Sequence, residues 1–201
     1  PSAYGANGGL CGVRSHQRAC LLSGDESAER VEAYDRAREE VLDRQLEAGR
    51  DLIVEGQLRW DDMLAHPLCV HDNVETRGIV RYYDNNNFYR EPVVRGDLTP
   101  DGDVTAELDA ASEVSQAVLP GPYSLAELAT DEYYGDGAAF LDAIAEFLAA
   151  EVDAFPVVET LFLLEPSLVT DAPADGEDER VSEAIDTVAA ATDADVVVHT
   201  Y

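Results

Sequence analysis

Short apolar runs that alternate with amphipathic stretches are the feature that most constrains the fold of this chain. The clearest runs lie at 52–54, 117–119, 161–164 and 196–198. Continuous rather than alternating apolar sequence is typical of strands buried on both faces of a parallel sheet. Because helical periodicity separates the runs, the sequence predicts an α/β fold with about five parallel strands.

The stretches between the runs carry apolar residues at helical spacing. The strongest predicted helix covers about 137–154, and a capping box at 23–26 opens another helix that ends at Gly49. The inward face of that first helix is expected to hold Val31, Tyr34, Val41, Leu42 and Leu46. Further helices are predicted near 104–114 and around 181–188, and a hairpin is predicted over 78–96.

The charge of the chain restricts its partners. The sequence has 42 acidic and 13 basic residues, all of the latter arginine, and a net charge of -29. Such a surface repels phosphate backbones and anionic lipid headgroups, so we expect neither nucleic acid nor a membrane as partner. The balance is typical of proteins in molar salt, where repulsion is screened, and indicates a halophilic source. Cysteines without zinc-site spacing favour a reduced, cytoplasmic environment.

The acidity begins abruptly. Residues 1–22 contain two arginines, two cysteines and no acid, whereas all acidic residues lie in 23–201. The first segment is therefore interpreted either as a flexible arm or as sequence from outside the original reading frame, and we favour the second because tails of acidic proteins share their acidity. Residues 23–201 are predicted to form one domain.

Polar or glycine–proline clusters follow several of the apolar runs. They are 55–57, 120–122, 165–166 and 199–201. The carboxyl ends of parallel strands are where ligand-binding groups collect, so the candidate chemistry falls on one face of the predicted fold. The sequence lacks the glycine patterns of dinucleotide and nucleoside-triphosphate sites after these runs, which argues against both classes.

Six segments, some of which include these clusters, resemble motifs of cobalamin-independent methionine synthases in the same order. The segments are 54–57, 61–63, 92–97, 119–124, 164–168 and 198–199. The resemblance covers about residues 25–201 and implies a TIM-type (β/α)8 barrel. Because such a barrel takes about 250 residues, it implies that this chain is a fragment, an incomplete barrel. The implied activity is methyl transfer from a folate, pterin-type or corrinoid donor to homocysteine, in methionine biosynthesis.

The resemblance also implies the site residues. In that family zinc activates the homocysteine thiolate, and the zinc-binding histidine at a strand end matches His199. We expect Gln57, Asp62, Gly121 and Glu165 to contact substrate. Zinc suits this chemistry because a coordinated thiol loses its proton outright at neutral pH.

Departures from the family pattern fall on these same positions. Tyr201 stands where the family has its first zinc-binding cysteine, and the remaining ligands come from later strands. Leu164 and Gln57 replace two carboxylates, so an α-ammonium group loses two anionic partners. Leu128 stands where the family has an aromatic residue that stacks on the pterin.

Three functions stay open at this stage. The first is a methionine-synthase-like methyltransferase that takes a small thiol and a methyl donor. In this case we expect the full-length protein to be active and the isolated chain to be inactive. The second is a non-catalytic barrel half that packs against the missing half or against a zinc-bearing homologous barrel. The third is a related metal-free barrel decarboxylase, with Arg59 and Arg81 as candidates to bind substrate carboxylates.

Overall fold

The computed structural model describes residues 28–82, 87–111 and 113–200. The expectations for residues 1–22, for the middle of the turn after the first hairpin arm and for Tyr201 lie outside these ranges. Within them, none of the helices combines the length and the apolar character that a membrane crossing requires.

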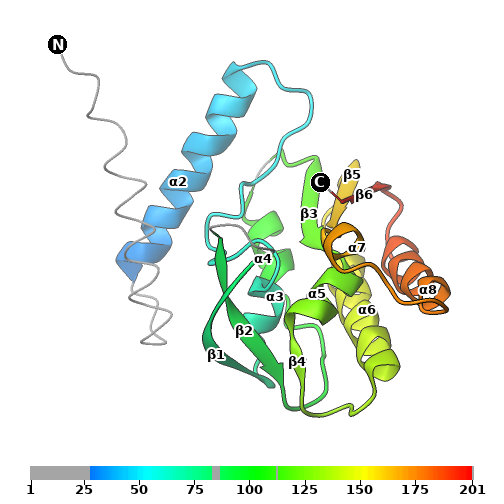
Figure 1. Cartoon of the computed structure of the whole chain (residues 1–201). Coiled ribbons are helices and arrows are strands. Elements are labelled where there is room, and N and C mark those ends of the chain that lie inside the picture. The colour runs from blue at the N-terminus through cyan, green and yellow to red at the C-terminus, as the bar shows by residue number, and fades with distance from the viewer. Residues whose placement is uncertain (1–27, 83–86, 112, 201) are drawn as a thin grey trace.

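A parallel sheet organises the carboxyl-terminal half. It consists of β3 (Gln116–Pro120), β5 (Thr160–Leu164) and β6 (Asp195–His199), in that spatial order. Helices α6 (Gly137–Asp153) and α8 (Asp178–Ala189) pack side by side and connect these strands (Figure 1). The α/β class is therefore confirmed, and the predicted runs and helices of this half lie where the periodicity placed them.

The second sheet also has three strands. The predicted hairpin is present as β1 (Val74–Arg81) paired antiparallel with β2 (Phe88–Val94), and the short β4 (Thr130–Asp131) pairs parallel with β2. The described residues thus form two three-stranded sheets, which corrects the expectation of about five parallel strands. Two departures account for the difference: the two arms of the hairpin run in opposite directions, and the run at 52–54 is not a strand.

The run at 52–54 lies beside β3 but is not a strand. Ile53 accepts hydrogen bonds from the backbone N–H groups of Ser115 and Gln116, each at 3.0 Å. The N–H and C=O groups of Val54 are instead satisfied by the side-chain amide of Gln45, at 3.1 and 2.8 Å. Side chains have replaced the backbone ladder here, which is why an apolar run failed to become a regular strand.

Helix α2 (Ala28–Glu47) buries a narrower face than the sequence predicted. Tyr34 and Leu42 are buried, and so is Arg38 between them. Val31 and Leu46 are exposed, so their placement on the inward face was wrong. Only one stripe of residues, spaced four apart, contacts the rest of the protein. The ends of α2 extend beyond the part of the protein against which the helix packs (Figure 1).

The main core lies on one face of the parallel sheet. Leu161 and Leu163 of β5 belong to the same apolar cluster as Phe147 and Leu148 of α6. Because side chains alternate along a strand, Leu164 faces the other side of the sheet. The shorter helices are α3 (His66–Cys69), α4 (Asp103–Asp109), α5 (Pro122–Leu128) and α7 (Ser167–Thr170).

Candidate functional site

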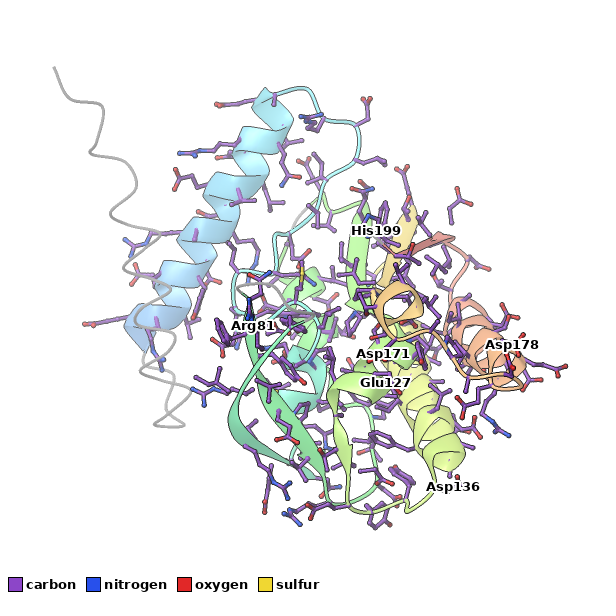
Figure 2. The ribbon with its side chains drawn as sticks, viewed as in Figure 1. Arg81, Glu127, Asp136, Asp171, Asp178 and His199 are labelled. Atoms are coloured by element: carbon purple, nitrogen blue, oxygen red, sulfur yellow. The ribbon has the colours of Figure 1, made fainter. Side chains whose placement is uncertain are left out.

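The three parallel strands end in one row of neighbouring residues. Pro120 is paired with Leu164, and Leu164 is paired with His199. Residues in register on neighbouring strands project from the same face, so these three side chains share the face opposite the main core. Figure 2 shows His199 at this end of the sheet. The structure thus brings the predicted metal ligand next to Leu164, and both residues are at least partly accessible.

Glu165, one residue further, turns to the opposite side. Its Oε1 accepts the backbone N–H of Tyr123 at 3.0 Å and its Oε2 accepts the N–H of Ser124 at 2.7 Å. The carboxylate therefore caps the amino-terminal end of α5 and is fully buried. Burial raises the pKa of Glu165 above its usual range, against the opposing effect of these hydrogen bonds.

Gly121 lies directly against that carboxyl group. A Cβ atom at this position would overlap the Glu165 carboxyl carbon, so only glycine fits. Its N–H also donates to the carbonyl oxygen of Leu164 at 2.8 Å, which ties the end of β3 to the end of β5. The structure explains this glycine by the packing of two strand ends, and its predicted substrate contact stays a prediction.

Gln57 is held at the edge of β3 that pairs with no other described strand. Its side-chain Nε2 donates to the carbonyl oxygen of Val118 at 2.9 Å, and its backbone N–H donates to Glu55 Oε1 at 2.9 Å. Gln57 and Gly56 both have positive φ angles, of 48° and 93°, so the chain turns sharply here. Gln57 therefore lies beside β3, near the end of the sheet where Pro120, Leu164 and His199 form their row.

Asp62 organises the turn that leads to α3. Its Oδ1 accepts the backbone N–H groups of Leu64 and Ala65 at 2.8 and 2.7 Å, and it also accepts the hydroxyl of Tyr82. This carboxylate thereby fastens the turn to the β1–β2 hairpin. Its predicted contact with substrate is likewise left as a prediction.

An apolar cluster packs against Leu164, on the face of the sheet opposite the main core. We call it the strand-end cluster, and it consists of Leu64, Ala65, Cys69, Tyr82, Tyr89, Leu128 and Leu164. The rings of Tyr82 and Tyr89 stack with their centroids 4.6 Å apart. Burial raises the pKa of the Cys69 thiol to about 12, so this thiol is protonated at neutral pH.

The residues present do not fit a zinc site. Among the described residues, no three His, Cys, Asp or Glu side chains lie close enough together to hold a metal ion. His66 stacks on Trp60 and contacts Asp103 at 3.1 Å, and the Nε2 of His71 lies 2.9 Å from the carbonyl oxygen of Thr99. In the described part of the chain, His199 is the only histidine at the end of a parallel strand. One histidine alone is insufficient to hold a zinc ion.

A buried charge network near this site was not predicted. Glu107 of α4 accepts from Arg38 of α2 at 3.1 Å and is also paired with Arg59. Of these three residues, only Arg38 could have been predicted from the sequence to be buried. It lies four positions from both Tyr34 and Leu42, so it falls on the inward stripe of its helix. Arg59 is therefore already paired with a carboxylate of the protein, Glu107. Arg81 lies on the hairpin, well apart from His199 (Figure 2).

Glu55 adds a buried carboxyl group to this region. Its Oε2 finds no hydrogen-bond partner among the residues that the structure describes, whereas its Oε1 accepts the N–H of Gln57. Burial is the main cause that raises its pKa, and the charge of Glu107 acts in the same direction. Glu55 could be recognised as a candidate because it directly follows an apolar run, but its charged neighbour Glu107 lies on a helix about fifty residues away.

The fold is similar to that of a solved methionine synthase. The structure of a B12-independent methionine synthase from Shewanella sp. W3-18-1, in complex with selenomethionine, matches with a TM-score of 0.70 and 17% sequence identity. The match covers 87% of this chain and 53% of that protein, so the chain spans about half of the neighbour's length. The sequence matches no protein-family model and no curated protein.

Proposed function

We propose that this chain forms part of a methionine-synthase-like barrel that transfers a methyl group to the sulfur of a thiol. The observation that carries the proposal is the likeness over 87% of the chain to a B12-independent methionine synthase. Three of the ordered sequence motifs, at 119–124, 164–168 and 198–199, support it, since they fall at the ends of β3, β5 and β6. The donor that the resemblance implies is a folate, a related pterin or a corrinoid, and the implied acceptor is homocysteine, in methionine biosynthesis.

In such a reaction the thiol sulfur forms a bond to the methyl carbon. The bond between that carbon and the donor breaks, its electron pair stays on the donor, and the thiol proton is released. The chain's own part is to position the acceptor at the row formed by Pro120, Leu164 and His199. No step is assigned to zinc, because the described residues do not form a site for it.

The proposal includes a macromolecular partner. One edge of β6 pairs with β5, and among the described strands none pairs with its other edge. Val197 and Val198 on this strand are exposed. An unpaired edge with exposed valines is a surface that a further strand would cover, supplied by the missing barrel half or by a homologous barrel protein.

The absence of a metal-binding trio among the described residues also favours a second candidate. In this candidate the chain is a non-catalytic half whose zinc-bearing homologue performs the transfer. The two candidates differ in one respect: the second predicts that mutation of His199 leaves methyl transfer by the assembled pair unchanged, whereas the first predicts a loss.

Two measurements test the proposal. Isothermal titration in molar salt compares thiols with their hydroxyl analogues, and we expect saturable binding of a thiol that exceeds binding of the matched alcohol. A methyl-transfer assay with a methylated folate and with methylcobalamin should show no turnover by the chain alone and turnover when a complete homologous barrel is added. Absence of thiol binding would contradict the proposed function, and robust turnover by the chain alone would contradict its predicted inactivity.

A further inference from the structure

The β1–β2 hairpin exposes large apolar side chains that the described part of the fold leaves uncovered. Seven of the eight residues of β1 are exposed, and β1 lies at the edge of its three-stranded sheet. Ile79 in β1 is 68% exposed, and Phe88 in β2 is 55% exposed. Exposed apolar side chains that lie close together are typical of a surface that another molecule covers.

These two side chains share one face of the hairpin. Ile79 is paired with Arg90, and Phe88 is paired with Arg81. Paired residues project from the same side of a sheet, as do residues two apart on one strand, so all four lie on one face. We call these four residues the hairpin face. Tyr89, between Phe88 and Arg90, projects from the opposite face and belongs to the strand-end cluster.

The hairpin is also the part of this acidic chain in which the charges balance. Strands β1 and β2 together carry three arginines and two glutamates. After Arg95, by contrast, the sequence contains 25 acidic residues and one arginine. Molar salt screens long-range repulsion, but charges in direct contact still attract or repel one another. A second acidic protein therefore meets carboxylates over most of this chain, and arginines mixed with apolar side chains on the hairpin face.

Ion pairs hold the hairpin in place before any partner arrives. Arg77 of β1 and Arg95, which follows β2, both pair with Glu132 beside β4. Arg90 lies 3.7 Å from Asp61 in the segment before α3. Because these pairs join both strands to other segments, the hairpin loses little conformational freedom when a partner docks.

We infer that the hairpin face is the surface on which the homologous barrel of the proposed function docks. The inference rests on that function and names the surface and the chemistry of the partner, which is an acidic protein with apolar side chains at the contact. Arginine and aromatic residues are enriched at such contacts. The hairpin face requires no strand from its partner, so a barrel whose strands are all paired can occupy it. Tyr89 on the opposite face shares the strand-end cluster with Leu164, so the hairpin connects the docked barrel to the middle of the strand-end row.

The test measures binding of a complete zinc-bearing barrel of the methionine synthase family, taken from a halophile so that its surface is acidic. We expect saturable binding to the wild-type chain by isothermal titration in molar salt. The double variant Ile79→Ser, Phe88→Ser should weaken this binding by at least about tenfold, because it removes the apolar centre of the contact. Both side chains are exposed, so the variant should fold, which circular dichroism checks. No binding to the wild-type chain, or unchanged binding to the folded variant, overturns the inference.

Two matched controls locate the docking surface. Val157→Ser replaces a valine that is 97% exposed in the loop before β5, and Val197→Ser changes the unpaired edge of β6. Both should bind the barrel as the wild-type chain does. A loss in either control as large as that in the hairpin variant contradicts the assignment to the hairpin face.

A charge reversal tests the acidic character of the partner. Arg81→Glu places a carboxylate on the hairpin face, where it meets carboxylates of the barrel. We expect this variant to bind the barrel at least about tenfold more weakly than the wild-type chain. Unchanged or tighter binding by Arg81→Glu contradicts an acidic partner.

Binding of L-homocysteine separates this inference from the proposed function. The hairpin face points away from the strand-end cluster, so the double variant alone should bind homocysteine as the wild-type chain does and lose only the turnover seen with the added barrel. A wild-type chain that binds homocysteine but not the barrel overturns the inference and leaves the proposed acceptor site standing. A wild-type chain that binds the barrel through the hairpin face but no thiol contradicts the proposed function and leaves the docking surface standing.

Discussion

The carboxyl group of Glu165 occupies the space in which a side chain at Gly121 would lie. This contact joins the end of β5 to the amino-terminal end of α5, because the same carboxylate accepts the N–H groups of Tyr123 and Ser124. The geometry of the whole strand-end row depends on it, since Gly121 also donates to Leu164.

Substitution of Gly121 tests this contact. We expect Gly121→Ala to lower the free energy of unfolding by about 1–3 kcal/mol, because the added methyl group must displace a buried carboxyl group. Gly137→Ala is the matched control, since a Cβ at Gly137 meets no atom within 4 Å, and alanine there should be neutral or stabilising. Chemical denaturation in molar salt measures both, and equal stability of the two variants would show that the strand ends are looser than described.

Glu55 should make the stability depend on pH. Its pKa in the folded chain lies above the ordinary carboxyl value, so folding binds a proton. Its contribution is fully present below the ordinary carboxyl pKa and is lost as the pH rises through the raised value. Glu55→Gln should therefore flatten the rise of stability as the pH falls from neutral toward about 4.5.

The same variant should raise stability at neutral pH by roughly 1 kcal/mol, because an amide at this buried position carries no charge to desolvate. Denaturation curves at several pH values measure both effects. Glu47→Gln on the exposed end of α2 removes an equal charge without burial and serves as the control. A pH profile that is the same for the wild type and Glu55→Gln would contradict this account of Glu55.

Salt should stabilise the folded chain strongly. With a net charge of -29, the folded state brings together carboxylates that repel one another when the screening length grows from about 3 Å at molar salt to about 10 Å at 0.1 M. We expect the thermal midpoint to fall steadily over this range, and to fall less in sulfate than in chloride. A midpoint that is independent of salt would contradict the interpretation of the acidic composition.

Metal content provides a separate check on the site. Because the described residues hold no metal-binding trio, we expect less than one zinc ion per chain after dialysis, measured by atomic absorption. His199→Ala should not change that value. One zinc ion per wild-type chain that is lost in His199→Ala would mean that ligands outside the described residues complete a site around this histidine.

Sequence periodicity predicted most of the elements and fewer of the side-chain directions. Helix α6 and strands β5 and β6 lie where the apolar pattern placed them, because short continuous apolar runs between helical stretches are typical of parallel strands. The run at 52–54 failed as a strand because Gln45 supplies its hydrogen bonds, and no local pattern reveals a partner from a neighbouring helix.

The candidate site shows the same limit. The strand-end motifs correctly placed Gly121, Glu165 and His199 at one end of the sheet. The sequence did not predict that the Glu165 carboxylate caps α5, because this contact depends on how the end of β5 packs against the start of α5. The network of Arg38, Glu107 and Arg59 joins positions far apart in the chain, and such contacts appear only in three dimensions.

The proposed function depends most on where a thiol binds, and amide chemical-shift mapping tests this directly. A spectrum of the isotope-labelled chain titrated with L-homocysteine in molar salt reports every backbone N–H group. We expect the largest shifts to cluster at Gly121, Leu164 and His199, the three neighbouring strand ends. Shifts concentrated elsewhere, such as on α8 or the outer end of α2, would contradict it.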